Sequence, residues 1–107
     1  MGNDLQENWK LIETFLRNAR SDLPMQASPS LEFSALLTEF DKYLSHNELG
    51  LALESIAAAG QLVETGGRFW HSLHQAAKKM ELHEQAQEFE FRFVQAATLG
   101  LERAQKQ

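Results

Sequence analysis

The sequence predicts an all-α protein, a compact bundle of about five helices that forms a single domain over residues 1–107. Apolar residues recur at three- and four-residue steps along most of the chain, and this is the period of a half-buried helix. The chain has 107 residues, an ordinary length for one domain. Its 43% hydrophobic and 23% charged residues are typical of a globular protein with its own core.

The first helix is expected over residues 5–20, where the apolar positions fall on one stripe. Leu23-Pro24 ends it, because proline disfavours helical backbone in the residue before it. The loop that follows contains both prolines of the chain, and Ser28-Pro29 fits a helix cap followed by proline at the first helical position. A second helix is therefore expected from there. The stripe of the first helix consists of Leu5, Trp9, Ile12, Phe15, Leu16 and Ala19.

The second and third helices are separated by Ser45-His46-Asn47-Glu48, which matches the capping box. In that motif a serine hydroxyl and a glutamate carboxylate bind free backbone N–H groups at a helix start. The third helix is therefore predicted to begin at Ser45, and Gly50 is predicted to mark close approach of a neighbouring helix. The expected core faces are Phe33, Leu36, Leu37, Phe40 and Leu44 on the second helix, and Leu49, Ala52, Leu53, Ile56, Ala59 and Val63 on the third.

Thr65-Gly66-Gly67 predicts the next break, because paired glycines favour positive φ and weaken a helix. A fourth helix follows, and Leu82-His83 is expected to form a short turn before a fifth. Residues 88–93 alternate as a strand would, but strong helix formers flank them and no partner strand is present, so a helix is favoured. The expected core faces are Phe69, Leu73, Ala76, Ala77 and Met80, then Ala86, Phe89, Phe93, Ala96 and Ala97.

The fifth helix carries a second apolar line, formed by Phe91, Val94, Thr98 and Leu101. Two interpretations remain open, and the first of them is favoured. The helix lies at the centre of the bundle, or it presents this side to a partner, including a second copy of the chain in a homodimer.

Negative charge is concentrated in one segment. The net charge is −5, and residues 32–64 contain six acidic residues against one lysine. This disfavours a nucleic-acid-binding protein, which needs Lys and Arg to neutralise phosphates, and suits a basic protein partner. The chain has no cysteine, no apolar leader and no apolar run near the length of a membrane span, so we expect a cytoplasmic protein without membrane contact.

Catalytic and metal sites are weakly supported. His71 and His74 have a metal-ligand spacing, but Lys78 lies on the same side of the helix and would repel a cation, so a partly exposed surface that includes Trp70 is favoured. The glutamates at 81, 84, 88 and 90 lack the Glu-x-x-His pattern of di-metal bundles and indicate a solvated face. No nucleophile or phosphate-loop motif is present. We predict no enzyme activity, no cofactor and no metal.

Two stretches carry a resemblance to a known family. They are YLSHNELGLALE at 43–54 and FWHSLHQAAKKM at 69–80. They resemble the MafI-like immunity proteins, small helical bacterial proteins encoded beside polymorphic toxins such as those of contact-dependent inhibition. The similarity runs from about Phe40 to Leu82. It implies a helical fold and a toxin partner, often a ribonuclease and in some cases one of the EndoU type, and it carries over no catalytic residue.

The expected function is therefore that of an immunity protein, which binds and neutralises a cognate toxin with a basic nuclease domain. A nuclease attracts phosphate, so its cleft is basic and an acidic inhibitor complements it. The alternatives are a self-associating helical adaptor and a metal-dependent enzyme that uses the two histidines. The predicted partner-binding residues are Glu32, Glu39, Asp41, Glu48 and Glu54, with Glu48 also expected in the capping box.

Overall fold

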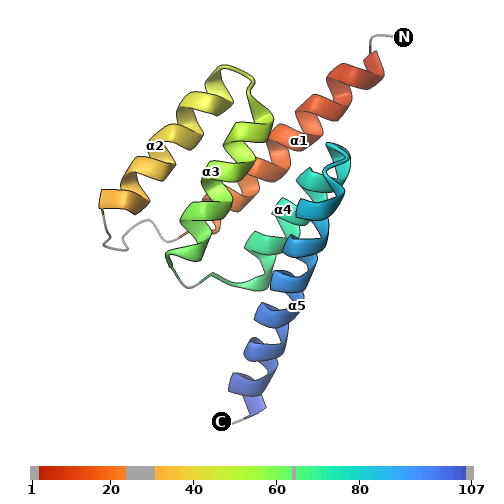
Figure 1. The fold of residues 1–107 in the computed structure, drawn as a ribbon. Helices are drawn as coiled ribbons and strands as arrows, with labels where there is room; N and C mark the ends of the chain where they lie inside the picture. The colour runs from red at the N-terminus through yellow and green to blue at the C-terminus, as the bar shows by residue number, and fades with distance from the viewer. Residues whose placement is uncertain (1–2, 24–30, 64, 106–107) are drawn as a thin grey trace.

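The computed structural model describes residues 3–23, 31–63 and 65–105, and side chains over 7–23, 31–63 and 65–99. This part of the chain forms five helices and no strand, so the predicted all-α class is confirmed (Figure 1). The predicted start at Ser28-Pro29 lies outside the described residues. The helices are α1 (Asn3–Ser21), α2 (Leu31–Ser45), α3 (Leu49–Gln61), α4 (Gly67–Lys79) and α5 (His83–Gln105).

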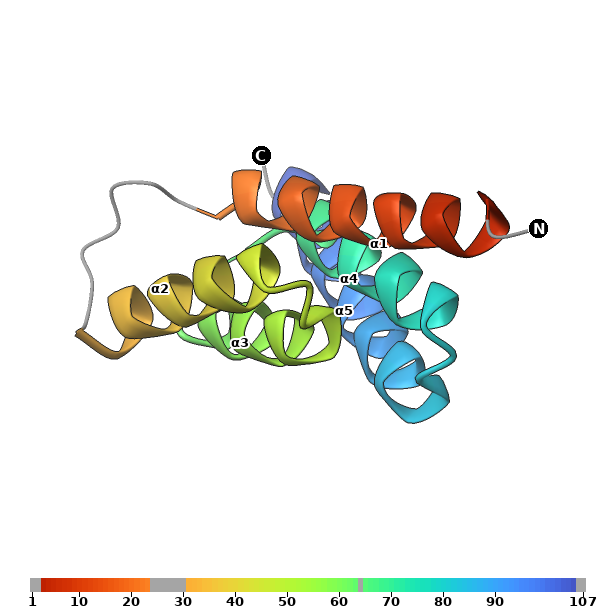
Figure 2. The same ribbon diagram turned by 90° about the horizontal axis from the view of Figure 1, so that it is seen from above.

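The helices are arranged as two antiparallel hairpins, with α1 lying alongside α4 and behind α3 (Figures 1 and 2). One hairpin pairs α2 with α3, and the other pairs α4 with α5. Helix α1 packs mainly against α4 and to a smaller extent against α3. Within the described residues, α3 and α4 are thus the inner helices, while α2 and α5 each pack principally against one neighbour.

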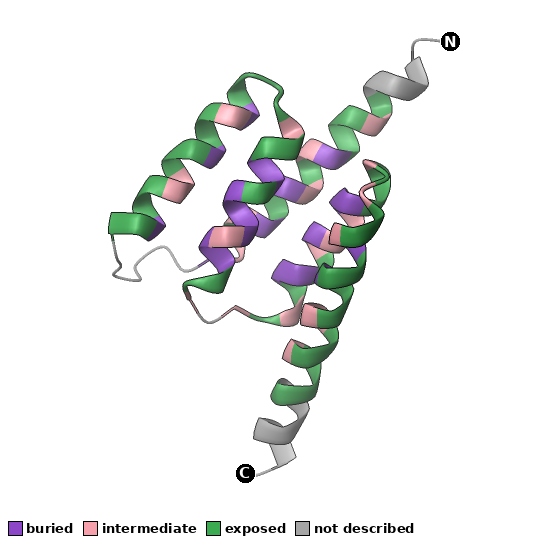
Figure 3. Ribbon diagram, viewed as in Figure 1, coloured by how far each residue is buried: buried purple, intermediate pink, exposed green. Residues whose placement is uncertain are grey.

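The core lies where these helices meet, and it is apolar as predicted (Figure 3). Phe40 and Phe69 are its largest fully buried side chains. Trp70 is 5% exposed and packs edge-on to Phe69 and stacked on Phe89, so its predicted place on a partly exposed surface is wrong. Trp9, in contrast, is more exposed than predicted. It belongs to the predicted stripe of α1 but is 51% exposed.

The predicted capping box at residues 45–48 is wrong, because these residues end α2 and do not begin α3. The Ser45 hydroxyl donates to the Lys42 carbonyl oxygen at 2.8 Å, and the α3 start has no side-chain cap. Asn47 has φ 58, and the N–H groups of Asn47 and Glu48 donate to the carbonyls of Leu44 and Tyr43 at 3.1 and 2.8 Å. This is the Schellman motif, in which a left-handed residue closes a helix C-terminus.

The end of α4 repeats this motif. Glu81 has φ 60, its N–H donates to the Lys78 carbonyl at 3.1 Å, and the N–H of Leu82 donates to the Ala77 carbonyl at 2.9 Å. Asparagine is tolerated in the left-handed region, whereas glutamate there is uncommon. Both hairpins therefore turn through the same hydrogen-bond pattern, with glycine in neither left-handed position.

Close helix approach occurs at a different glycine from the one predicted. A Cβ added at Gly50 would have no heavy atom within 4 Å, so the expected contact there is absent. At Gly60 a Cβ would overlap the ring of Phe69, which places α3 directly against α4. The chain breaks between α3 and α4 as predicted, but not through the expected positive φ. No described glycine has positive φ, and Gly66 is in an extended conformation as the N-cap of α4.

Residues 88–93 are helical, as predicted against their strand-like alternation. Phe89 is 2% exposed, whereas Phe91 and Val94 on the second apolar line are 63% and 53% exposed. The favoured interpretation of α5 as the central helix of the bundle is therefore wrong for its described side chains. Gly67, the first residue of α4, lies against Phe93, so the antiparallel α5 continues well past the N-terminal end of α4 (Figure 1). None of the described helices is long and apolar enough to cross a membrane.

Candidate partner-binding face

All five acidic residues predicted to bind a partner are exposed, but the structure does not bring them together. On α2, Glu32 and Glu39 are seven residues apart and so lie on the same side of the helix. Asp41 is two residues after Glu39, about 200° around the helix, and lies on nearly the opposite side. A flat partner surface that covers Glu39 therefore does not reach Asp41.

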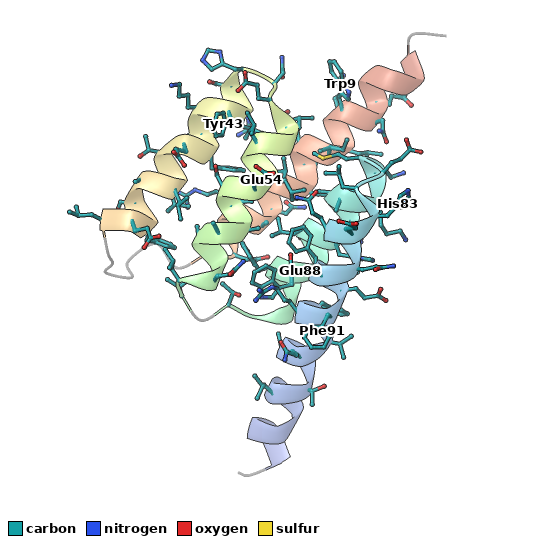
Figure 4. The ribbon with its side chains drawn as sticks, in the orientation of Figure 1. Trp9, Tyr43, Glu54, His83, Glu88 and Phe91 are labelled. Atoms are coloured by element: carbon teal, nitrogen blue, oxygen red, sulfur yellow. The ribbon has the colours of Figure 1, made fainter. Side chains whose placement is uncertain are left out.

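The position of Tyr43 indicates which side of α2 lies on the same face of the molecule as Glu54. It lies one turn after Glu39 on the same side of α2, and it is half-buried against the core. Figure 4 shows Tyr43 on α2 and Glu54 on α3 on the same face of the molecule. Glu32 and Glu39 therefore share a face with Glu54.

Helix α5 adds carboxylates to that face. Glu54 lines a shallow hollow with Leu82, His83, Glu84 and Gln85, so Glu54 of α3 and Glu84 of α5 stand on its two sides. Glu88 lies one turn after Glu84, and Figure 4 shows it on the face that carries Glu54. We call the exposed set formed by these side chains the acidic face. Its members are Glu32, Glu39, Glu54, Glu84 and Glu88.

Glu84 and Glu88 were interpreted from the sequence as an ordinary solvated face, and so their relation to Glu54 was missed. Their i, i+4 spacing already places both on one side of a helix. Their position opposite Glu54 depends on how α3 and α5 lie around α4, which no local pattern indicates.

Glu48 has a different position from the other predicted residues. The α3 start makes no side-chain cap bond, so the capping role expected for Glu48 is absent and its carboxylate is exposed. Glu48 lies in the turn between α2 and α3, where its neighbours Asn47 and Leu49 line hollows beside Trp9. This is the end of the bundle and not the acidic face.

The charges of the molecule are segregated by helix. The segment from α2 to α3, residues 31–61, contains five acidic residues and one lysine. Helix α4 contains Arg68, Lys78 and Lys79 and no acidic residue. A field with its negative side at the α2–α3 hairpin follows from this arrangement.

The histidines of α4 are engaged in structural hydrogen bonds. His74 Nδ1 donates to the Ala86 carbonyl oxygen at 2.9 Å and so ties α4 to α5. The Gln75 amide donates to His71 Nε2 at 2.8 Å, and the His71 ring lies 5.0 Å from that of Phe93. Among the side chains that the structure describes, no three or more His, Asp or Glu residues are grouped as metal ligands. The predicted absence of a metal stays a prediction.

An arginine, a tryptophan and a glutamate meet at the edge of the acidic face. The Arg92 guanidinium lies 5.1 Å from the centre of the Trp70 ring, and its nitrogen is 3.7 Å from the Glu88 carboxylate. Arg92 Nε is buried and has no hydrogen-bond partner in the described part of the chain. The cation is thus held by the aromatic face and one carboxylate.

Comparison with known proteins adds no further assignment. No protein-family model matches the chain, and no similar curated protein or solved structure was found.

Proposed function

We propose that this protein is an immunity protein that binds and neutralises a basic toxin domain, of the nuclease kind, by direct protein contact. The observation that supports the proposal is the acidic face, where α2, α3 and α5 contribute five exposed carboxylates. The resemblance of residues 40–82 to MafI-like immunity proteins favours the same partner class. In this proposal the protein acts in the cytoplasm as a stoichiometric inhibitor and has no catalytic role.

The physical basis is electrostatic complementarity with an apolar contribution. Carboxylates opposite a basic cleft steer the encounter and compete with the phosphates that the cleft attracts. A stable interface needs about 800 Å² from each partner. That is roughly a tenth of the 7315 Å² surface of this protein, so an interface of ordinary size needs only a small part of the surface.

Charge reversal tests the proposal with a matched control. Glu39→Lys with Glu54→Lys should weaken toxin binding at least about a hundredfold, because each opposed charge pair costs several kcal/mol. Glu7→Lys with Glu90→Lys changes the net charge by the same amount at exposed sites outside the acidic face, and should retain binding. Binding is measured by calorimetry with the toxin recovered by co-purification from the native cell, and protection by survival of cells that express that toxin.

Two results would contradict the proposal. One is equal loss of binding in both double variants, which would mean that binding depends on the net charge of the protein and not on the position of the acidic face. The other is full protection by the Glu39→Lys, Glu54→Lys variant. The geometry also makes Asp41→Lys informative, because Asp41 lies on the other side of α2 and its reversal should leave binding within about threefold of the parent protein.

A self-associating adaptor is the second candidate, and the outer side of α5 favours it. Phe91, Val94 and Leu99 are 63%, 53% and 52% exposed on a helix that contacts mainly α4. Light scattering of the purified chain at micromolar concentration separates the two. A stable dimer that Phe91→Gln dissociates, together with recovery of no toxin, would replace the immunity proposal with this one.

A further inference from the structure

Three segments distant in the sequence meet around Trp9 at one end of the bundle. One hollow is lined by Trp9, Lys10 and Glu13 of α1 and by Asn47 and Leu49 of the turn between α2 and α3. A second hollow shares Trp9, Asn47 and Leu49 and extends to the end of α4, where the Asn8 amide donates to the Lys79 carbonyl oxygen at 3.3 Å. Trp9 therefore forms a wall common to both hollows.

The first hollow combines an aromatic face, a carboxylate and an aliphatic wall. Trp9 and Glu13 are four residues apart on α1, so their side chains stand next to each other. Trp9 is 51% exposed, and Figure 4 shows it on the N-terminal half of α1, away from the core. Leu49 lies across the hollow. The hollow has a volume of about 320 Å³. This is at the lower limit for small-molecule pockets, about 300 Å³, and suits a single side chain.

The same chain shows what such a set of groups binds. At Trp70 the cation of Arg92 lies over the indole ring and beside the Glu88 carboxylate. Trp9 and Glu13 supply the same two groups, an indole and a carboxylate one helical turn away, but at the surface. An Arg17 guanidinium nitrogen lies 3.4 Å from Glu13 Oε1, and this exposed pair is weak.

We propose that the hollow between Trp9 and Glu13 is a socket for an arginine side chain of the partner, an inference that rests on the proposed function for the basic character of that partner. The guanidinium stacks on the Trp9 ring and pairs with the Glu13 carboxylate, while its aliphatic stem packs on Leu49. Trp and Arg are the residue types most enriched at interface positions that dominate affinity. Glu48, exposed in the adjacent turn, adds negative charge at the rim.

Lys10 also lines this hollow, and it gives the proposal a second, opposite readout. Its ammonium repels an incoming guanidinium, so Lys10→Gln should tighten arginine binding while Glu13→Gln weakens it. An apolar occupant would be indifferent to both changes. The sign of the two effects therefore distinguishes a cationic side chain from an aliphatic one.

The test uses N-acetyl-arginine methylamide as the probe and the full chain as the protein. Nuclear magnetic resonance follows the indole N–H signals, of which the chain has two, from Trp9 and the buried Trp70. The probe should shift the Trp9 signal saturably in the millimolar range and leave Trp70 unmoved. The citrulline and norleucine analogues should bind at least severalfold more weakly, because one lacks the charge and the other lacks the guanidinium.

Glu13→Gln should weaken binding of the probe about threefold or more, and Lys10→Gln should tighten it. Glu90→Gln, at an exposed site outside both the socket and the acidic face, is the control that leaves probe binding unchanged. An equal or larger Trp9 shift with norleucine, or no effect of Glu13→Gln, overturns the socket. The probe contains no toxin, so this result is independent of the immunity proposal. Probe binding without toxin capture would refute the function alone, and toxin capture without probe binding would refute the socket alone.

Discussion

At Gly60 the backbone of α3 lies directly against α4, because an added Cβ would overlap the Phe69 ring. Gly60→Ala should lower the free energy of unfolding by about 1–2 kcal/mol, since overpacking costs about 1–3 kcal/mol and exceeds the helix propensity gained. The measurement is urea unfolding followed by circular dichroism.

Gly50→Ala is the matched control in the same helix. A Cβ at this exposed position meets nothing within 4 Å, so alanine should raise stability by about 0.5 kcal/mol. If both variants were stabilised to the same extent, the close contact between α3 and α4 would be wrong.

Glu81 stores backbone strain at the end of α4, because its φ of 60 is unfavourable for a residue with a Cβ. Glu81→Gly should raise the free energy of unfolding by about 0.5–1 kcal/mol, the relief being offset in part by the greater freedom of glycine in the unfolded chain. Asn47→Gly, at the equivalent place after α2, should change stability by less than about 0.5 kcal/mol, because asparagine tolerates this region. Thermal unfolding of the two variants side by side checks the difference.

Residue patterns were misleading at these turns for a physical reason. Ser45-His46-Asn47-Glu48 satisfies the capping-box pattern, but Asn47 is also suited to a left-handed helix end, and that alternative satisfies two carbonyls of α2. The choice between the two is made by the backbone direction that lets α3 pack on α2. The helices on either side were predicted correctly, and only the residues that join them were not.

At the scale of one element, α5 shows how far periodicity alone can be used. The alternation of phenylalanines at 89, 91 and 93 is that of a strand, yet a helix places Phe89 and Phe93 inward and Phe91 outward. The helical flanks were sufficient to predict the helix. They were insufficient to predict whether its second apolar line is covered, because that depends on which helices pack beside α5. In the described part of the chain α5 packs mainly against α4.

Two truncations on α5 test this orientation. Phe89→Ala should cost about 3–5 kcal/mol, because the ring is 2% exposed and stacks on Trp70. Phe91→Ala, 63% exposed, should change the free energy of unfolding by no more than about 0.5 kcal/mol. A large loss at Phe91 in a protein that sediments as a dimer would show that a second copy covers this side.

At the scale of the whole molecule, five helices and most core residues were predictable because one period of 3.6 residues governs them all. The candidate site was predictable only in part. The sequence indicated that acidic residues of the segment 32–64 form the site. In the structure, however, Asp41 and Glu48 lie off the acidic face, while Glu84 and Glu88 belong to it. These assignments depend on how α2 packs on α3 and on how α3 and α5 lie around α4, which is a property of the assembled fold.

The segregation of charge between the α2–α3 hairpin and α4 predicts a salt-sensitive encounter. Raising the ionic strength should slow association with the basic partner about tenfold or more and change dissociation little, because screening acts mainly on long-range steering. Stopped-flow mixing at several salt concentrations measures both rates. The Glu39→Lys, Glu54→Lys variant should lose most of this dependence, and an unchanged salt dependence would argue against steering by these residues.

The unequal environments of the two tryptophans give the molecule two distinguishable fluorescent reporters, one at the surface of α1 and one in the core. Trp9 meets water and should emit at long wavelength and be quenched by iodide, whereas Trp70, shielded between Phe69, Phe89 and Arg92, should emit at short wavelength and resist the quencher. Loss of iodide quenching would then report occupation of the α1 end, while a red shift of the protected component would report the opening of α4 from α5. Binding and unfolding can thus be followed in one unlabelled sample, as separate wavelength components of its intrinsic tryptophan fluorescence.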